Sequence, residues 1–241
     1  MPTIIRQVKQ ANKDFNYENE INVGVAGGIG TPESALASFV LGADFIMTGS
    51  INECTVEAAI SDEVKDLLQD INVQDTEYAP ASDMFEIGSK VQVLKRGVLF
   101  PARANKLYDL YRNFPSLESI DKKTLDQIED KYFGESLESV FNHIKSYYSE
   151  EEIIRAEENP KVKMAMIFKY YCYISSKWAL QGEVKNKVNF QIYCSPALGA
   201  FNKWIGETEL AQWQNRHVDE IAIMLMKETA ILFNERCKLF V

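Results

Sequence analysis

The sequence lacks a long apolar run, a signal peptide and a surplus of positive charge. No apolar stretch approaches the ~20 residues that a membrane span needs. The first twenty residues contain neither the apolar core nor the small-residue cleavage site of a signal peptide. Lys and Arg total 26 against 35 Asp and Glu, a formal charge of −9, which disfavours broad attraction to nucleic acid or anionic lipid. We therefore expect a cytoplasmic protein with neither a nucleic-acid partner nor a membrane partner.

Residues that bind metals or form redox pairs are scarce as well. The four cysteines form no C-x-x-C pair, so neither a zinc knuckle nor a redox dithiol is indicated. Only His143 and His217 are present, which argues against a histidine-rich metal site. Cys194 precedes Ser195, which suggests a nucleophile, but no histidine or acid is spaced to activate the thiol. The sequence therefore predicts no metal site and mostly buried, reduced thiols.

The chain is long enough for a barrel but does not contain the strands of one. Its 241 residues nearly match the ~250 residues of a (β/α)₈ barrel. Firm strands are predicted only at 21–26 and 43–48. The helix between them has Thr31 as N-cap and Pro32 in its first position, and Gly42 ends it. Strand, helix and strand in ~30 residues form a βαβ unit, which implies parallel pairing.

After Ser50 the pattern becomes mostly helical. The predicted elements are a helix over 56–71, a strand or hairpin over 91–100, mostly helix over 102–181, a short extended piece over 187–194, and helices that begin near Pro196 and Thr208. No internal repeat or low-complexity linker separates these elements. The overall prediction is an α/β chain with a large helical part.

Both predicted strands run into glycine at their carboxyl ends, in Gly27-Gly28-Ile29 and in Gly49-Ser50. In a parallel sheet these ends lie on one edge, and glycine lets backbone N–H groups approach an anion. The Ser50 hydroxyl and the start of a following helix would add donors. This pattern is typical of a phosphate cradle after the last two strands of a (β/α)₈ barrel. The alternative is that these are ordinary turn glycines, and no G-K-[ST] follows that would indicate a P-loop.

The stretch GVAGGIGTPESALASFVLGADFIMTGSINECTVEAAISDEVKDLLQ resembles the PfaD-type trans-acting enoyl reductases. These enzymes serve polyunsaturated fatty acid synthases and trans-acyltransferase polyketide synthases. Four later stretches resemble the same family in the same order: DMFEIGSKVQVLKRGVLFPARANKLYDLY, NPKVKMAMIFKYY, QIYCSPALGAFNKWI and NRHVDEIA. The wider superfamily, which includes nitronate monooxygenases, shares only the A-G-G-I and T-G-S parts.

The resemblance implies an FMN-binding (β/α)₈ (TIM) barrel with a large, mostly α-helical accessory domain. By this resemblance Gly27, Gly28, Ile29, Gly49 and Ser50 lie at the FMN phosphate. The flavin would take hydride from NADPH and pass it to the β-carbon of an enoyl thioester on an acyl carrier protein. Catalytic residues stay unidentified, because the family's substrate-side histidine loop lies in a portion that this chain does not match.

The chain matches only the C-terminal part of such a protein. The expected parts are 1–55 as the last βαβ segment of the barrel, 56–206 as a mostly helical accessory or substrate domain, and 207–241 as a C-terminal helix. We expect the N-terminal barrel half as a partner, exposed apolar edges on the two strands, and no enoyl reduction by this chain alone. The alternatives are a non-catalytic helical segment that docks a carrier protein or the barrel half, and a nitronate monooxygenase-like flavoprotein.

Other polar and aromatic features allow two interpretations each. The basic cluster Lys95, Arg96, Arg103 and Lys106 either contacts a phosphopantetheine arm, an acidic carrier protein or the NADPH phosphate, or is a solvated edge. For His217, capping or packing is favoured over a role as catalytic acid. An aromatic stripe either forms core, which is favoured, or lines an acyl channel. Its members are Phe168, Tyr170, Tyr171, Tyr173 and Trp178.

Overall fold

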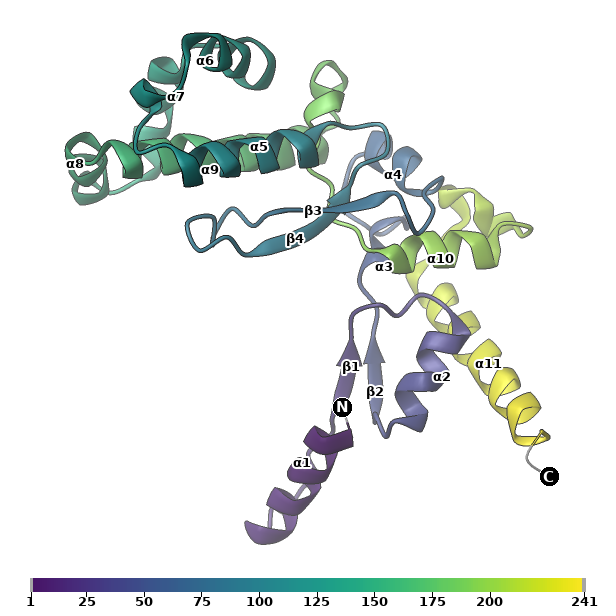
Figure 1. Ribbon diagram of the computed structural model, residues 1–241. Helices are drawn as coiled ribbons and strands as arrows, with labels where there is room; N and C mark the ends of the chain where they lie inside the picture. Colours follow the sequence, from purple (N-terminus) through teal and green to yellow (C-terminus); the bar gives the residue numbers. More distant parts are fainter. Residues whose placement is uncertain (1, 240–241) are drawn as a thin grey trace. The chain divides into compact units, whose positions relative to one another are not determined.

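The computed structural model describes residues 2–239 and shows a mostly helical α/β protein with two small sheets (Figure 1). The chain folds as two compact units that alternate along the sequence. Unit 1 comprises residues 2–59, 65–75 and 194–239, and unit 2 comprises residues 60–64 and 76–193. The expected division into a barrel segment, an accessory domain and a C-terminal helix, with boundaries at 55 and 206, stays a prediction. Residues 1, 240 and 241 lie outside the described residues.

Unit 1 contains a parallel pair of strands flanked by helices. Its elements are α1 (Pro2–Asp14), β1 (Gly24–Ala26), α2 (Pro32–Val40), β2 (Phe45–Met47), α3 (Ser50–Glu53), α10 (Pro196–Ile205) and α11 (Val218–Cys237), with 3-10 turns η5 (Glu209–Ala211) and η6 (Trp213–Asn215). β1 and β2 pair in parallel, with Val25 opposite Ile46. The predicted βαβ unit is therefore confirmed.

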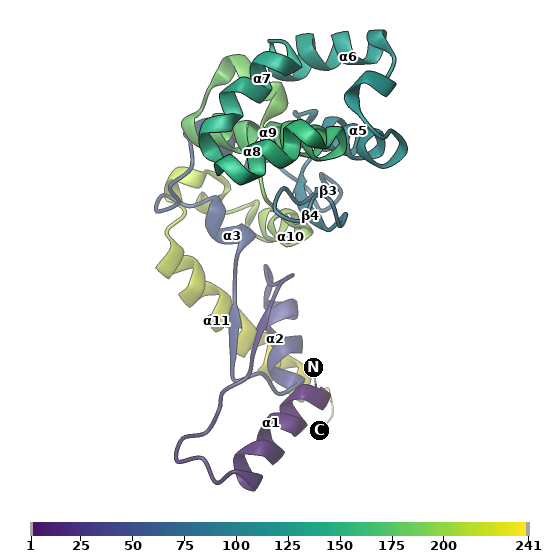
Figure 2. The ribbon, with the colours of Figure 1, turned by 90° about the vertical axis from the view of Figure 1, so that its left-hand side faces the viewer.

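The sequence signals at the ends of α2 act as predicted. Thr31 is the N-cap with extended backbone, and the Ser34 hydroxyl accepts a hydrogen bond from the Thr31 N–H at 3.2 Å. Gly42 follows the helix with φ +99°, a left-handed conformation that favours glycine. α2 packs against α11, as Figures 1 and 2 show, and α11 buries Ile221 and Leu225.

The helix predicted over 56–71 forms only as α4 (Asp62–Leu68), which begins in unit 2 and ends in unit 1. The prediction is wrong for the preceding residues because tertiary hydrogen bonds occupy them. The Val56 N–H donates to the Arg216 carbonyl at 2.9 Å, and the Glu57 carboxylate accepts from the Val218 N–H at 3.2 Å. Long-range partners therefore override the local helical pattern.

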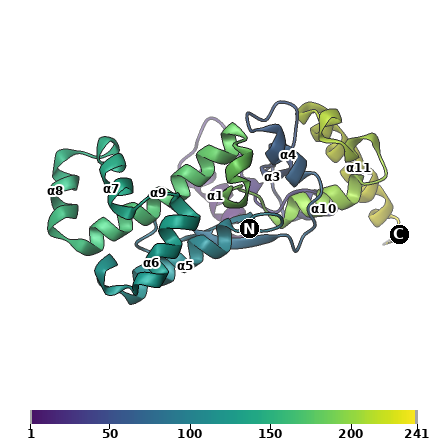
Figure 3. The same ribbon diagram turned by 90° about the horizontal axis from the view of Figure 1, so that it is seen from above.

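Unit 2 combines an antiparallel hairpin with a helical array. Its elements are β3 (Thr76–Pro80), β4 (Lys90–Leu94), α5 (Phe100–Asn113), η1 (Leu117–Ser119), α6 (Lys122–Ile128), the π-helical turn η2 (Glu129–Phe133), α7 (Leu137–Ile144), η3 (Lys145–Tyr147), α8 (Glu150–Glu158), α9 (Pro160–Gln181) and η4 (Val184–Asn189). Tyr78 on β3 lies opposite Gln92 on β4. α5 and α9 lie side by side (Figures 1 and 3). The predicted predominance of helix over 102–181 is confirmed.

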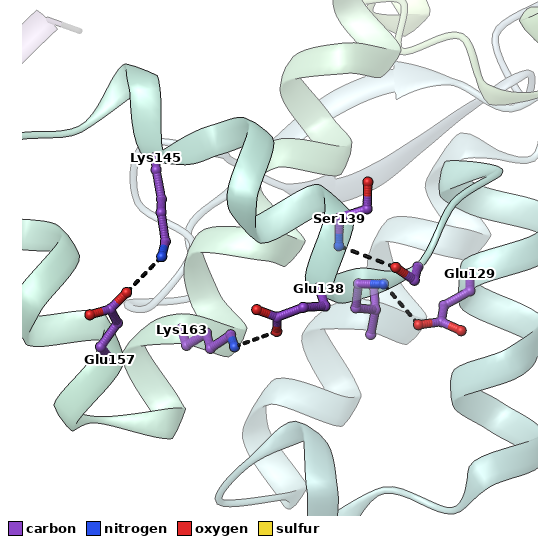
Figure 4. Close-up of polar contacts among 8 residues, drawn as sticks. Glu129, Glu138, Ser139, Lys145, Glu157 and Lys163 are labelled. Atoms are coloured by element: carbon purple, nitrogen blue, oxygen red, sulfur yellow. Dashed lines mark hydrogen bonds and ion pairs between the residues drawn. The ribbon is translucent and has the colours of Figure 1, made fainter.

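An aromatic core holds unit 2 together. Phe100, Phe141, Phe168 and Tyr171 are completely or almost completely buried in one cluster. Ion pairs lie on the surface of unit 2 (Figure 4). Lys163 lies 2.8 Å from Glu138, and Lys145 lies 2.6 Å from Glu157. Exposed pairs of this kind contribute at most ~1 kcal/mol each, whereas burying one large apolar side chain contributes ~1.5–3 kcal/mol. The core therefore dominates the stability of this unit.

Candidate functional site

The parallel strand pair brings the two glycine-rich segments to one edge. Ala26 and Met47 are partners at the ends of β1 and β2. Gly27 and Gly28 follow Ala26 directly, while Thr48 and Gly49 follow Met47. The sequence-predicted site residues are therefore adjacent at the carboxyl edge of the β1–β2 sheet. We call Gly27, Gly28, Ile29, Gly49 and Ser50 the glycine edge.

The glycines of this edge have open space where side chains would stand. Gly27 and Gly28 adopt φ values of +87° and +74°, which only glycine takes without strain. A Cβ built at Gly27, Gly28 or Gly49 meets no atom within 4 Å. Side chains at these positions would fill the space that a small ligand needs in order to reach the backbone. Glycine therefore keeps the space at this edge open.

The residues that follow the two open glycines of this edge, Ile29 and Gly30, are closely packed, with Gly30 against α10. The Ile29 side chain is buried, so it anchors the loop rather than facing a ligand. A Cβ at Gly30 would lie 2.3 Å from the Ala197 carbonyl oxygen, in the first turn of α10. Glycine at position 30 thus permits close approach of two backbones. The segment that begins at Cys194 therefore helps to shape the glycine edge.

Ser50 is held by Ser195, a residue 145 positions later in the chain. The Ser195 N–H donates to Ser50 Oγ at 3.0 Å, and the Ser50 hydroxyl donates to Ser195 Oγ at 2.9 Å. A hydroxyl has one proton and two lone pairs. Reversal of the hydroxyl hydrogen bond, with Ser195 as donor, would engage both lone pairs of Ser50 and free the Ser50 proton to point at an anion. The sequence analysis did not predict a role for Ser195 and named it only as the neighbour of Cys194. A serine directly before a proline is nevertheless a signal for the start of a helix.

Three of the four thiols are buried and protonated. Burial raises the pKa of Cys194 to about 12 and that of Cys172 to about 12. Burial also raises the pKa of Cys54 to about 11, although Arg216 and Lys65 oppose the shift. A thiol that stays protonated at neutral pH is a poor nucleophile. The interpretation of Cys194 as a buried thiol is confirmed, while Cys237 is exposed.

His217 belongs to the start of α11 rather than to the glycine edge. It occupies the N-cap position, and its Nδ1 lies 2.7 Å from Glu57 Oε1. Hydrogen bonding with Glu57 raises the pKa of His217, and the same hydrogen bond lowers the pKa of Glu57. The His217 side chain contacts Glu57 and makes no capping hydrogen bond of its own. The favoured capping or packing role stays a prediction. His143 is exposed and lies 3.6 Å from Glu135.

Arg103 and the aromatic stripe serve mainly to build unit 2. The Arg103 guanidinium donates to the Lys131 carbonyl at 2.7 Å and to the Asn189 side chain, which also accepts from the Tyr171 hydroxyl at 2.8 Å. Arg103 is therefore a structural link within the basic cluster. Phe168 and Tyr171 lie in the core, as favoured, whereas Tyr173 is exposed.

Residues 2–239 contain neither a membrane-spanning helix nor a cluster of metal ligands. No helix there combines the length and apolar character that crossing a membrane requires. No group of three or more His, Cys, Asp and Glu side chains is arranged there to hold a metal ion.

Comparison with known proteins finds relatives of part of the helical unit and of the whole chain. Residues 114–190 match the family described as "[Acyl-carrier-protein] S-malonyltransferase, inserted helical domain". The chain is 58% identical over 236 residues to the polyketide biosynthesis protein PksE of Bacillus subtilis (strain 168) and spans 31% of it. It is 38% identical over 218 residues to a polyunsaturated fatty acid synthase component of a Thraustochytrium species and spans 11% of it. The chain is therefore similar to parts of polyketide and polyunsaturated fatty acid synthase proteins.

A solved structure narrows this class further. The enoyl reductase domain of MlnA, from the macrolactin biosynthesis cluster of Bacillus amyloliquefaciens, is 45% identical with a TM-score of 0.96. The match covers 100% of this chain and 55% of that one. Over most or all of its length the chain is similar to this enoyl reductase domain and to polyketide and polyunsaturated fatty acid synthase proteins. The resemblance seen in the sequence is therefore confirmed. The chain spans less than a third of PksE and about half of the MlnA domain.

Proposed function

We propose that this chain is the C-terminal portion of a flavin-dependent enoyl reductase. The observation that carries the proposal is the glycine edge, where two parallel strands end in open glycines beside the Ser50 hydroxyl. FMN supplies hydride transfer from NADPH to the β-carbon of an enoyl thioester. The thioester is carried by an acyl carrier protein, in keeping with the synthase relatives.

The donors of the glycine edge suit a phosphate. Gly27, Gly28, Ile29 and Gly49 offer backbone N–H groups, Ser50 offers a hydroxyl, and none of the five carries a negative charge. Backbone N–H groups in a concave turn bind anions well. These residues would hold the FMN phosphate and so fix the position of the ring system. Ser195 would keep the Ser50 hydroxyl in a donating orientation.

The β1–β2 pair is proposed to be part of a (β/α)₈ barrel. The apolar side chains of Phe45 and Met47 on β2 are exposed, as expected for a strand that packs against further strands in a barrel. A cavity of about 340 Å³ beside β2 is lined mostly by apolar side chains, among them Ile46, Ile221 and Leu225. The relatives are longer than this chain, and strands from their additional length would cover these surfaces. Reduction of enoyl thioesters is therefore assigned to the assembled barrel, not to this chain alone.

The second candidate is a non-catalytic docking segment. The observation that favours it is the match of residues 114–190 to an inserted helical domain, together with the self-contained core of unit 2. Such a segment would bind a carrier protein without any flavin. A nitronate monooxygenase-like flavoprotein is less favoured, because the alignments with synthase proteins include the helical part of this chain.

A titration with FMN and with riboflavin tests the proposal. The chain is titrated alone and together with a polypeptide that corresponds to the remainder of the MlnA domain, and flavin fluorescence is recorded. We expect FMN to bind about tenfold or more tightly than riboflavin, which lacks the phosphate. Absence of FMN binding in both preparations would overturn the proposal and leave the docking segment.

A matched pair of glycine variants localises the binding. Gly28 and Gly134 have nearly equal φ values of +74° and +73°, and a Cβ at either meets nothing within 4 Å. Gly28→Ala and Gly134→Ala therefore introduce the same strain, one in unit 1 and one in unit 2. We expect Gly28→Ala to weaken FMN binding about tenfold, and Gly134→Ala to leave it unchanged. Equal effects would show that the glycine edge is not the phosphate site.

A further inference from the structure

Basic residues gather around Arg103 in a chain that is acidic overall. Residues 95–106 contain four basic residues and no acidic residue, and residues 184–189 contain two lysines and no acidic residue. The chain as a whole has a formal charge of −9. A local excess of positive charge on such a chain creates a field of opposite sign to its surroundings.

Hydrogen bonds bring these separate segments together. The Arg103 guanidinium contacts Lys131 through its carbonyl and Asn189 through its side chain. The Leu99 N–H donates to the Val188 carbonyl at 2.7 Å, which joins the start of α5 to η4. Residues 95–106, the turn at 131 and residues 184–189 are therefore neighbours within unit 2. Arg103 is the link between them and is itself half-buried.

The lysines of these segments remain available to a partner. Lys95 and Lys131 are exposed, and Lys106 and Lys187 are half-exposed. Among residues 2–239 none of these four lysines has a carboxylate oxygen within ion-pair distance. Lys106 donates to the uncharged Gln127 amide at 3.0 Å. By contrast, Lys145, Lys163 and Lys169 elsewhere in unit 2 are all paired with glutamates.

We propose that Lys95, Lys106, Lys131 and Lys187, the basic surface of unit 2, dock the acidic face of an acyl carrier protein. The proposal rests on the proposed function, which assigns a carrier-bound substrate to this protein. Positive residues spread over three chain segments fit an extended acidic protein surface. A single small anion would require donors that converge on one point. Residues 114–190, which include Lys131 and Lys187, match an inserted domain named for a protein that acts on acyl carrier protein.

Charge reversal tests the docking surface. The variant Lys95→Glu/Lys131→Glu/Lys187→Glu is compared with Lys9→Glu/Lys13→Glu/Lys227→Glu, which changes the net charge equally on exposed positions of unit 1. The probe is a purified, phosphopantetheinylated acyl carrier protein of a polyketide synthase, and calorimetry measures its affinity at low and at physiological salt. A Lys→Gln version of the first variant, with melting curves, guards against misfolding.

We expect the unit 2 reversal to weaken carrier binding about tenfold or more, and the unit 1 reversal to change it less than about twofold. Wild-type affinity should fall as salt rises, because charged surfaces are screened. Equal binding by both variants, salt-independent binding, or no binding of the carrier by the wild-type chain would each overturn the inference. FMN titration of the same variants reports separately on the proposed function, and unchanged FMN binding with lost carrier binding supports the docking surface alone.

Discussion

The two units differ in how they bury apolar side chains. In unit 2 the buried aromatic residues Phe85, Phe100, Phe141 and Phe168 meet in one cluster whose members all come from that unit. In unit 1 several large apolar side chains stay exposed on α2, β2 and α11, including Val40, Met47, Ile223 and Phe233. Exposed apolar patches of this kind mark contact surfaces. We therefore expect the unit that carries the glycine edge to need further contacts, and the helical unit to be stable without them.

Deletion of a core aromatic ring should have the largest effect and should separate the two units most clearly. Phe168 is completely buried in unit 2, while Phe45 on β2 is nearly half exposed. We expect Phe168→Ala to lower the free energy of unfolding by about 3–5 kcal/mol. Phe45→Ala should cost less than about 1 kcal/mol, because little contact is lost. Urea unfolding followed by circular dichroism measures both, and similar losses would refute the contrast.

A methyl group at position 30 should disturb unit 1 next most strongly. The Cβ of Gly30→Ala would lie 2.3 Å from the Ala197 carbonyl oxygen, so α10 must shift away from the glycine edge. We expect a loss of about 1–3 kcal/mol in the free energy of unfolding. Gly49→Ala is the control, because its Cβ meets nothing within 4 Å. That control should unfold like the wild type while binding FMN more weakly, and equal destabilisation by both substitutions would contradict this structure of the loop.

Removal of the Ser195 hydroxyl should affect ligand binding more than stability. Ser195→Ala keeps the backbone N–H that donates to Ser50 Oγ but removes the hydroxyl that lies 2.9 Å from it. A neutral hydrogen bond contributes about 0.5–1.5 kcal/mol, so FMN affinity should fall about 3- to 10-fold. Riboflavin affinity should not change, because riboflavin has no phosphate. Ser116→Ala in unit 2 is the matched control, and an equal loss with both flavins would assign Ser195 a purely structural role.

The smallest effect concerns the pH response of the α11 start. His217 has a raised pKa, so its stabilising contribution is present below its ordinary value of 6.5 and is lost as pH rises through the folded value. Glu57 has a lowered pKa, so its contribution is present above 4.5 and is lost as pH falls through the folded value. The pair therefore acts most strongly between these two pH values. In Glu57→Gln the pKa of His217 should return toward 6.5, as NMR titration of the imidazole would show. An unchanged pKa would refute the pairing.

Local signals predicted the elements around the glycine edge well. The cap at Thr31, the stop at Gly42 and the two strands depend on neighbours a few positions away, and the structure confirms them. The strands are shorter than predicted, because only Gly24–Ala26 and Phe45–Met47 pair. Contacts between distant segments were not predictable in this way. The shortening of the predicted 56–71 helix follows from hydrogen bonds to Arg216 and Val218, and nothing local marks Ser195 as the partner of Ser50.

The buried Arg216 shows the same limit. Its side chain is completely buried, donates to the Leu210 carbonyl at 2.7 Å and lies 5.6 Å from the Phe201 ring. Arginine side chains usually lie on the surface, so the burial of Arg216 could not be predicted from the sequence alone. Likewise, Arg103 was predicted as part of a basic cluster, but its role as a link depends on carbonyl and amide groups from segments 28 and 86 residues away.

Amide hydrogen exchange with and without FMN distinguishes the two units. We expect α5 and α9 of unit 2 to be strongly protected in both conditions, because their apolar side chains are buried. Residues 24–30 and 45–53 of unit 1 should exchange faster and become protected when FMN, but not riboflavin, is added. Equal protection of both units without ligand, or FMN-dependent protection that leaves the glycine edge unchanged, would show that the glycine edge does not bind the FMN phosphate.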